Sequence, residues 1–159
     1  MKHPVREMME TDAYTCHYTQ TLGDVVRILV NKKIGGIPIL DDDRYVMGFI
    51  SDGDIMKAVA KQGTLSVLIG DTAVVVNDNE AFEEKVADLM SRNVMELATR
   101  KVIWVTPEQP VDEVAKILSK KRIKKVPVLE KGKLVGVISR STIMRDIFQR
   151  LFHIAPEDE

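Results

Sequence analysis

The sequence predicts an α+β fold in which two similar units pack on each other as one module with pseudo-twofold symmetry. Three observations support this prediction. Residues 21–40 are repeated at residues 110–129. Within each copy, apolar residues recur first at the spacing of a helix and then in short runs typical of strands. Each copy has only about 60 residues, which is too few for a stable core alone, so the copies are expected to pack together.

The repeat stays in register through two blocks. Residues 21–40 read TLGDVVRILVNKKIGGIPIL, and residues 110–129 read PVDEVAKILSKKRIKKVPVL, 89 positions later. The following turn is one residue shorter in the second copy, and the offset then becomes 88. Identical residues at these offsets include Val25 and Val114, Leu29 and Leu118, Pro38 and Pro127, Gly48 and Gly136, and Ser51 and Ser139.

The elements follow the same order in both copies. Apolar residues from Leu22 and from Val111 onward recur every three or four positions, which predicts amphipathic helices. Runs rich in β-branched residues, separated by polar turns, then predict a hairpin in each copy. The expected hairpin strands are residues 36–40 with 45–50 in the first copy and 126–129 with 133–138 in the second. The expected second helices are residues 51–61 and 139–152. Each unit is expected to begin with a short extended segment, near residues 14–16 and 102–105.

The copies and the stretch between them predict the domain organisation. Residues 5–9 (VREMM) resemble residues 86–90 (VADLM), so the second copy is expected to begin near residue 86. The connector contains apolar runs and an acidic helix start, but its pattern does not determine its arrangement. The expected organisation is a first unit over residues 1–62, a connector over 63–85, a second unit over 86–152 and a flexible tail over 153–159.

Composition excludes several classes of protein. With 45% hydrophobic and 30% charged residues, the chain is typical of a globular domain and not of a disordered or membrane-spanning one. A net charge of -1 argues against a general nucleic-acid binder, so an anion site would have to be local. Cys16 is the only cysteine, and the N-terminus lacks a secretion signal. We expect a cytoplasmic protein with no membrane contact and no specific nucleic-acid partner.

A short motif follows the hairpin in both copies. It reads Gly48-Phe-Ile-Ser51-Asp-Gly-Asp54 in the first copy and Gly136-Val-Ile-Ser139-Arg-Ser-Thr142 in the second. Together with the proline-containing strand before it, this motif resembles a tandem pair of cystathionine beta-synthase (CBS) domains, often called a Bateman module, over almost the whole chain. The resemblance implies that each unit is a small sheet with two helices packed on one side.

The resemblance also implies a function. Modules of this family bind adenosine compounds such as AMP, ADP, ATP or S-adenosylmethionine in clefts between their units, usually to regulate another protein. No catalytic or transport domain accompanies the two copies in this sequence, so we expect a sensor or a regulator in trans that requires no cofactor. The alternative is a dimerisation or protein-interaction scaffold that binds no ligand.

Enzymatic activity is the least supported class. No nucleophile, acid/base pair or metal cluster stands out, and the histidines at positions 3, 17 and 153 lack the spacing of metal ligands. Cys16 and His17 are neighbours on an extended segment, so their side chains are expected to face opposite ways. We therefore expect neither a catalytic residue nor a metal site.

Ser51 and Asp54 are the central candidates for ligand binding. By themselves they are typical of a capping box, in which a hydroxyl and a carboxylate three residues apart satisfy free N–H groups at a helix start. In the family this aspartate accepts hydrogen bonds from both hydroxyls of a ribose, and the two oxygens of a carboxylate suit a vicinal diol. Ser51 is compatible with both capping and contact to the ligand.

The phosphates of a nucleotide need cations from elsewhere, because Asp52 and Asp54 would repel an anion at this helix start. In the family the opposite unit supplies them from just before its proline-containing strand, where this chain has Lys124 and Lys125. The alternative is that these lysines only solvate the end of a helix and offset its dipole.

The adenine base would need an apolar sandwich and backbone hydrogen bonds. The candidates for this role are Thr15, Cys16, Ile37, Pro38 and Ile50, although the aliphatic residues are equally compatible with an ordinary core.

A second cleft would combine Ser139 and Thr142 with Gly35 and Gly36. It is expected to be the weaker site, because Thr142 replaces the family's acidic residue and the glycines offer no charge. Each chain is therefore expected to bind one nucleotide well.

The second helices carry more apolar residues than one two-unit core needs. We expect them to form the interface of a homodimer, as is usual in the family. These residues are Ile55, Met56, Val59, Ile143, Met144, Ile147, Phe148, Leu151 and Phe152.

Overall fold

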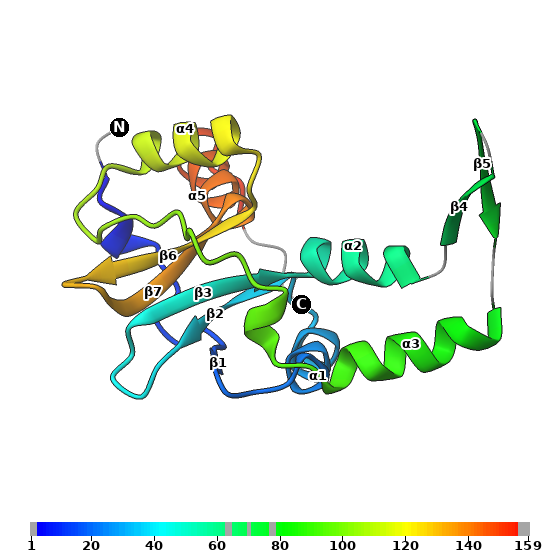
Figure 1. Ribbon diagram of the computed structural model, residues 1–159. Helices are drawn as coiled ribbons and strands as arrows, with labels where there is room; N and C mark the ends of the chain where they lie inside the picture. The colour runs from blue at the N-terminus through cyan, green and yellow to red at the C-terminus, as the bar shows by residue number, and fades with distance from the viewer. Residues whose placement is uncertain (1–2, 63–64, 70, 77–78, 156–159) are drawn as a thin grey trace. The chain divides into compact units, whose positions relative to one another are not determined.

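The structure is a computed structural model that describes residues 3–62, 65–69, 71–76 and 79–155 (Figure 1). It is a mixed α/β protein with small sheets. In chain order, its elements are η1 (Val5–Glu7), β1 (Cys16–His17), α1 (Leu22–Lys32), β2 (Gly36–Leu40), β3 (Val46–Ser51), α2 (Asp52–Gln62), β4 (Leu65–Ile69), β5 (Thr72–Val76), α3 (Asn79–Ser91), η2 (Val94–Glu96), α4 (Val111–Lys121), β6 (Lys125–Glu130), β7 (Lys133–Ser139) and α5 (Arg140–Phe152).

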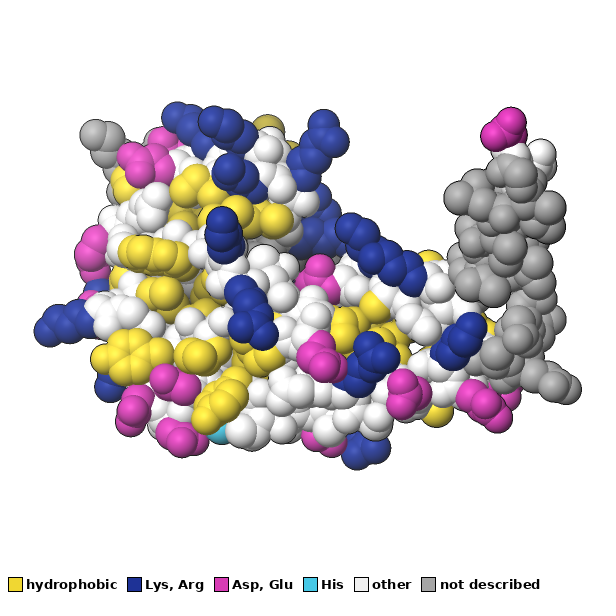
Figure 2. All heavy atoms as spheres, in the orientation of Figure 1, with side chains coloured by type: hydrophobic (Ala, Val, Ile, Leu, Met, Phe, Trp, Pro, Cys, Tyr) yellow, Lys and Arg dark blue, Asp and Glu magenta, His cyan; other side chains and the backbone are white. Residues whose placement is uncertain are grey.

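The chain forms two compact units. One unit, here called the C-terminal unit, contains residues 1–14, 43–46 and 102–159, and the other, here called the central unit, contains residues 15–42 and 47–101. Charged side chains of both signs are scattered over the face shown in Figure 2, in keeping with the nearly neutral net charge. The compact units divide the chain differently from the two sequence copies, whose boundaries remain a prediction about the repeat.

The first helix of each copy forms as the apolar spacing predicted. Thr21 caps α1 through a capping box with Asp24, whereas α4 follows Pro110 and has acidic residues in its first turn. Both helices end at a residue in the left-handed conformation, Lys33 with φ of 53° and Arg122 with φ of 54°. The two copies therefore share the geometry of the helix end as well as its sequence position.

The predicted hairpins and second helices are also present. The strands β6 and β7 pair in antiparallel fashion, β2 lies between β1 and β3, and α2 and α5 follow directly after the second strands. Cys16 on β1 pairs in parallel with Ile39, and Val105 forms a parallel bridge with Val128. Both pairs are related by the offset of 89 residues, so the opening extended segments are confirmed in both copies.

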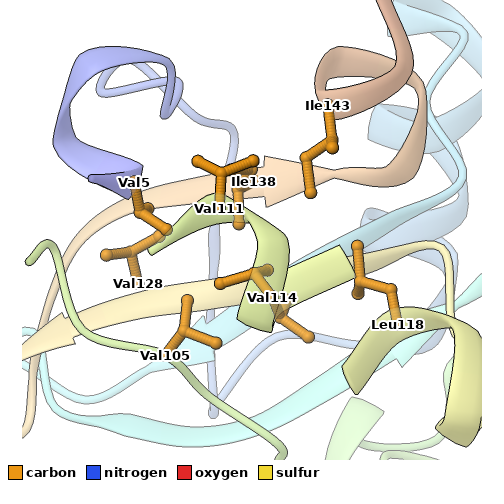
Figure 3. Packing of buried hydrophobic residues seen from close by; sticks show 9 residues of the cluster. Val5, Val105, Val111, Val114, Leu118, Val128, Ile138 and Ile143 are labelled. Atoms are coloured by element: carbon orange, nitrogen blue, oxygen red, sulfur yellow. The ribbon is translucent and has the colours of Figure 1, made fainter. Parts of the chain in front are cut away.

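The core of the C-terminal unit lies between its two helices and its hairpin. Figure 3 shows Val111, Val114 and Leu118 of α4 and Ile143 of α5 directed toward buried side chains of β6 and β7. Val5, from the opening segment of the chain, belongs to the same cluster and is fully buried. The two helices lie on one side of the hairpin, as the resemblance implied (Figure 1).

The core of the central unit has the same construction. Its buried residues come from α1, β1, β2 and β3, and α2 contributes partly buried residues packed against them. Leu89 of α3 and Val94 of η2 complete the cluster. This buried set is Cys16, Leu22, Val25, Leu29, Ile37, Ile39, Ile50, Leu89 and Val94.

The residues that follow η1 and η2 each pair with the second hairpin strand of the other copy. The backbones of Glu10 and Val137 exchange hydrogen bonds of 2.8 and 2.9 Å, and Thr99 and Phe49 exchange two bonds of 2.9 Å. This close approach explains the glycine of the repeated motif, because a Cβ atom at Gly136 would lie 2.9 Å from the carbonyl oxygen of Glu10.

Residues 5–9 and 86–90 have similar sequences but differ in the structure. Residues 86–90 lie within α3, whereas residues 5–7 form η1, whose counterpart in the second copy is η2 at residues 94–96. The offset of 89 residues therefore extends back to the start of the repeat. A short helical turn with one apolar residue has no periodicity of its own, which is why the sequence pattern did not reveal it.

The connector forms a hairpin and a helix. β4 and β5 pair in antiparallel fashion, with Leu65 opposite Val76 and Ile69 opposite Thr72. The acidic helix start predicted in this stretch is the beginning of α3, which contacts α1 and α2. At the other end of the chain, residues 153–155 are exposed, and the rest of the predicted tail lies outside the described residues.

Candidate functional site

Ser51 and Asp54 form a complete capping box where β3 passes into α2. The backbone N–H of Asp54 donates to Oγ of Ser51 at 3.2 Å, and the backbone N–H of Ser51 donates to Oδ2 of Asp54 at 3.1 Å. The capping interpretation is therefore confirmed. Both side chains are half-buried, and the box orients the carboxylate of Asp54.

A second capping box has nearly the same geometry but stands at a different helix. At the start of α1, Asp24 N–H donates to Oγ1 of Thr21 at 3.2 Å, and Thr21 N–H donates to Oδ2 of Asp24 at 3.2 Å. Asp24 was no candidate for ligand binding. The pair of boxes thus offers a way to separate capping from any further role of Asp54.

The equivalent helix start of α5 contains hydroxyls only. Oγ of Ser139 accepts from the backbone N–H of Thr142 at 3.2 Å and forms hydrogen bonds with the hydroxyls of Thr142 and Ser141, at 2.9 and 3.0 Å. Thr142 replaces the carboxylate of Asp54 with a single hydroxyl. The α5 start therefore lacks the charged acceptor present at α2.

In each unit, the segment before the proline-containing strand is tied to the start of the second helix. The carbonyl of Gly35 accepts from Asp52 N–H at 2.8 Å, and the carbonyl of Lys124 accepts from Arg140 N–H at 2.7 Å. Gly36 also permits close packing, because a Cβ atom there would lie 2.8 Å from the ring of Phe49.

The predicted site residues fall into two sets. Thr15, Cys16, Ile37, Pro38, Ile50, Ser51 and Asp54 all belong to the central unit, together with Gly35 and Gly36. Lys124 and Lys125 belong to the C-terminal unit, together with Ser139 and Thr142. The adenine and ribose candidates therefore lie in one compact unit, and the phosphate candidates lie in the other.

The two helix starts carry opposite charge. The first turn of α2 contains Asp52 and Asp54, whereas α5 has no acidic residue in its first turn and begins with Arg140. Arg140 and Lys124 are both exposed. Sequence reasoning did not include Arg140 among the cations, although its position directly after Ser139 places it at a helix N-terminus, which favours anions.

Several of the adenine candidates are buried in the core of the central unit. Cys16, Ile37 and Ile50 have exposed fractions of 4%, 1% and 0% and belong to its hydrophobic cluster. Burial raises the pKa of the Cys16 thiol to about 12, so the thiol stays protonated and apolar at neutral pH. Pro38 is buried and Thr15 is half-buried. Because strand neighbours face opposite ways, Pro38 is directed away from the side of Ile37 and Ile39.

His17 is tied to side chains of its own unit. Its Nε2 lies 2.7 Å from Oδ1 of Asp42, and its Nδ1 lies 2.6 Å from the hydroxyl of Thr19.

Within residues 3–62, 65–69, 71–76 and 79–155, no group of three or more His, Cys, Asp or Glu side chains is arranged to hold a metal ion. None of the helices described is long and apolar enough to cross a membrane.

Comparison with known proteins identifies the repeated unit. The family model of the CBS domain matches residues 5–61 and 86–149. The uncharacterized protein MJ1426 from Methanocaldococcus jannaschii is 28% identical over 130 residues, which cover 76% of this chain and 77% of that protein. The chain spans 43% and 60% of the length of two further curated relatives.

Two solved structures have the same fold. The CBS domain pair of protein MJ0100, in complex with 5′-methylthioadenosine and S-adenosyl-L-methionine, matches with a TM-score of 0.72 and 24% identity, over 94% of this chain and 99% of that one. CBSX2 in complex with AMP matches with a TM-score of 0.71 and 20% identity, over 93% and 98% of the two chains. The repeat, the fold and the family match agree, and the chain belongs to the CBS domain family.

Proposed function

We propose that this protein is a regulatory module that binds an adenine nucleotide, or a related adenosyl compound, and transmits its occupancy to a protein partner by a change of conformation. The observation that carries the proposal is the half-buried carboxylate of Asp54, which the capping box holds at the start of α2. The AMP, 5′-methylthioadenosine and S-adenosyl-L-methionine found with CBS pairs of the same fold support this ligand class. The expected compartment is the cytoplasm.

Asp54 recognises the ribose in this proposal. Its Oδ2 already accepts one backbone hydrogen bond, and a carboxylate oxygen has a second lone pair, so both oxygens remain able to accept from the ribose hydroxyls. Thr15, which is half-buried, provides a side-chain contact for adenine, and the buried Pro38 supports the pocket from β2. The side chains of Cys16, Ile37 and Ile50 form the packed support beneath, and their backbone groups serve the hydrogen-bonding edge of the base.

Lys124 and Lys125 bind the nucleotide phosphates. Replacing both with Ala is expected to weaken ATP more than adenosine, because the lost contacts go to phosphate and not to sugar or base. Raising the salt concentration should have the same selective effect, since it screens an exposed lysine–phosphate pair but not an apolar adenine pocket. Calorimetry with both ligands tests this, and equal losses for ATP and adenosine would contradict the assignment. The same two affinities, for ATP and for adenosine, should be measured for Arg140→Ala, which removes the cation at the start of α5.

A thermal-shift screen with AMP, ADP, ATP and S-adenosylmethionine tests the function itself. A ligand at 100 times its dissociation constant stabilises the folded state by about 2.7 kcal/mol, which raises the Tm of a chain of this size by roughly 5 to 10 °C. We expect such a shift with at least one of the four ligands and one tight site per chain in calorimetry. No shift with any of them would overturn the proposal, and two equal tight sites would contradict the weaker role of Thr142.

A ligand-free dimerisation scaffold is the second candidate function. It is favoured by an apolar stripe on α5, where the rings of Phe148 and Phe152 stack with centroids 5.3 Å apart and both side chains are exposed. Met144 and Leu151 extend the stripe at helical spacing. A dimer that forms normally while the ligand screen is negative would support this alternative.

A further inference from the structure

A basic patch lies on α4 and the segment that follows it. Six of the ten residues 116–125 are Lys or Arg, and none is Asp or Glu. Figure 2 shows Lys and Arg side chains gathered over α4. We define the basic patch as the exposed residues Lys116, Lys120, Lys121, Arg122 and Lys124. It extends well beyond Lys124, which is the only one of the five assigned to the nucleotide.

The patch is not neutralised locally. Within the described part of the chain, no ion pair involves any of its five residues. Like charges one helical turn apart repel each other, so Lys120, which follows Lys116 by one turn, does not stabilise α4. The patch therefore leaves several positive charges available to a multiply charged anion.

The other copy of the repeat shows that the fold does not require this much charge. The equivalent run, residues 27–36, contains three cations, with Asn31, Gly35 and Gly36 in place of the lysines at 120, 124 and 125. Yet α1 ends in the same left-handed cap as α4. A helix dipole is offset by a cation in its last turn, which α1 achieves with Lys32 alone.

The chemistry of the patch fits one kind of macromolecule. The apolar residues Val111, Val114 and Leu118 of α4 are directed into the core (Figure 3). All exposed residues between positions 112 and 124 are polar. Protein interfaces depend on buried apolar or aromatic anchors, and helices that bind membranes present an apolar face. A phosphodiester backbone, in contrast, can be bound mainly through Lys and Arg contacts, without an apolar anchor.

We propose that the basic patch binds the phosphodiester backbone of nucleic acid without regard to base sequence. The net charge of -1 argues against a general nucleic-acid binder, so this proposal departs from that expectation and confines the contact to one local basic patch. Lysines on consecutive turns of α4 provide point charges for successive phosphates, and the absence of exposed aromatic side chains on this stretch leaves no group to stack on bases.

Fluorescence anisotropy with labelled duplex DNA and single-stranded RNA of about 20 nucleotides tests the proposal. The wild-type protein should bind oligonucleotides of unrelated sequence equally, with log K falling linearly as log salt rises. The variant Lys116→Gln/Lys120→Gln/Lys121→Gln should weaken duplex binding about tenfold or more near 50 mM salt and reduce the magnitude of the salt slope by about 2.7. Lys124 and Lys125 stay intact, so ATP binding by this variant should be unchanged.

A matched variant removes the same charge from the central unit. Arg27→Gln/Lys85→Gln/Lys101→Gln changes three exposed cations there, and its nucleic-acid affinity should stay within about twofold of the wild type. Equal losses in the two variants would show that net charge alone drives binding and would overturn the patch. The absence of wild-type binding near 50 mM salt, or displacement of RNA by polyglutamate at equal charge concentration, would also overturn the proposal.

Discussion

Replacing Asp54 with Ala is expected to lower the affinity for an adenine nucleotide by roughly 10- to 150-fold. The substitution removes a charge-assisted acceptor for the ribose hydroxyls, which is worth about 1.5 to 3 kcal/mol. The fold should survive, because loss of a helix cap costs only about 1 kcal/mol of unfolding free energy. Calorimetry with the ligand that gives the largest thermal shift measures the affinity, and chemical denaturation measures the stability.

Asp24→Ala is the matched control for this variant. Asp24 occupies the same position in a capping box with almost the same distances, so its loss should cost a similar free energy of unfolding, about 1 kcal/mol. Nucleotide affinity should not change, because Asp24 caps α1 and has no role at the start of α2. If the two variants bind nucleotide equally well, capping is the whole role of Asp54.

A second large effect is expected at the exposed stripe of α5. We expect the 17.9 kDa chain to form a homodimer, and Phe148→Glu should then convert this dimer into monomers at micromolar concentration. Burying one Phe side chain contributes about 1.5 to 3 kcal/mol, and a twofold interface contains it twice, so the dimer dissociation constant should rise at least about 100-fold. Light scattering over a concentration series measures this change.

The structure narrows the set of residues available for that interface. Ile143 is buried in the core of its unit, and Ile55, Val59 and Ile147 are packed against the two core clusters. Met56, Met144, Phe148, Leu151 and Phe152 are exposed, so these five residues are the ones we expect at the dimer interface.

Val30→Glu controls for the added charge in the α5 experiment. Val30 is 68% exposed on α1 and lies outside the α5 stripe, so its replacement should leave the oligomeric state unchanged. A wild-type protein that scatters as a monomer would exclude the homodimer outright. A Phe148→Glu variant that remains dimeric would move the interface away from α5.

Local sequence patterns determined most of the secondary structure and the capping at the candidate site. Helical spacing from Leu22 and Val111, and the β-branched runs around Pro38 and Pro127, predicted elements that formed within a few residues of their expected bounds. The box of Ser51 and Asp54 was also predictable, because a cap depends only on residues three positions apart. Because the sequence is repeated, the helices and strands assigned in one copy also predicted those of the other.

Only the tertiary structure decided how distant segments combine. The pairing of Glu10 with Val137 and of Thr99 with Phe49 joins backbones far apart in the chain, and backbone hydrogen bonds leave no side-chain pattern in the sequence. Burial likewise showed that the side chains of Cys16, Ile37 and Ile50 belong to the core. The sequence alone does not reveal whether an apolar residue on a short strand faces the core or a ligand. Local spacing thus determined the elements, whereas long-range packing decided which faces of them remain available to a ligand, because burial depends on every segment that packs against a strand.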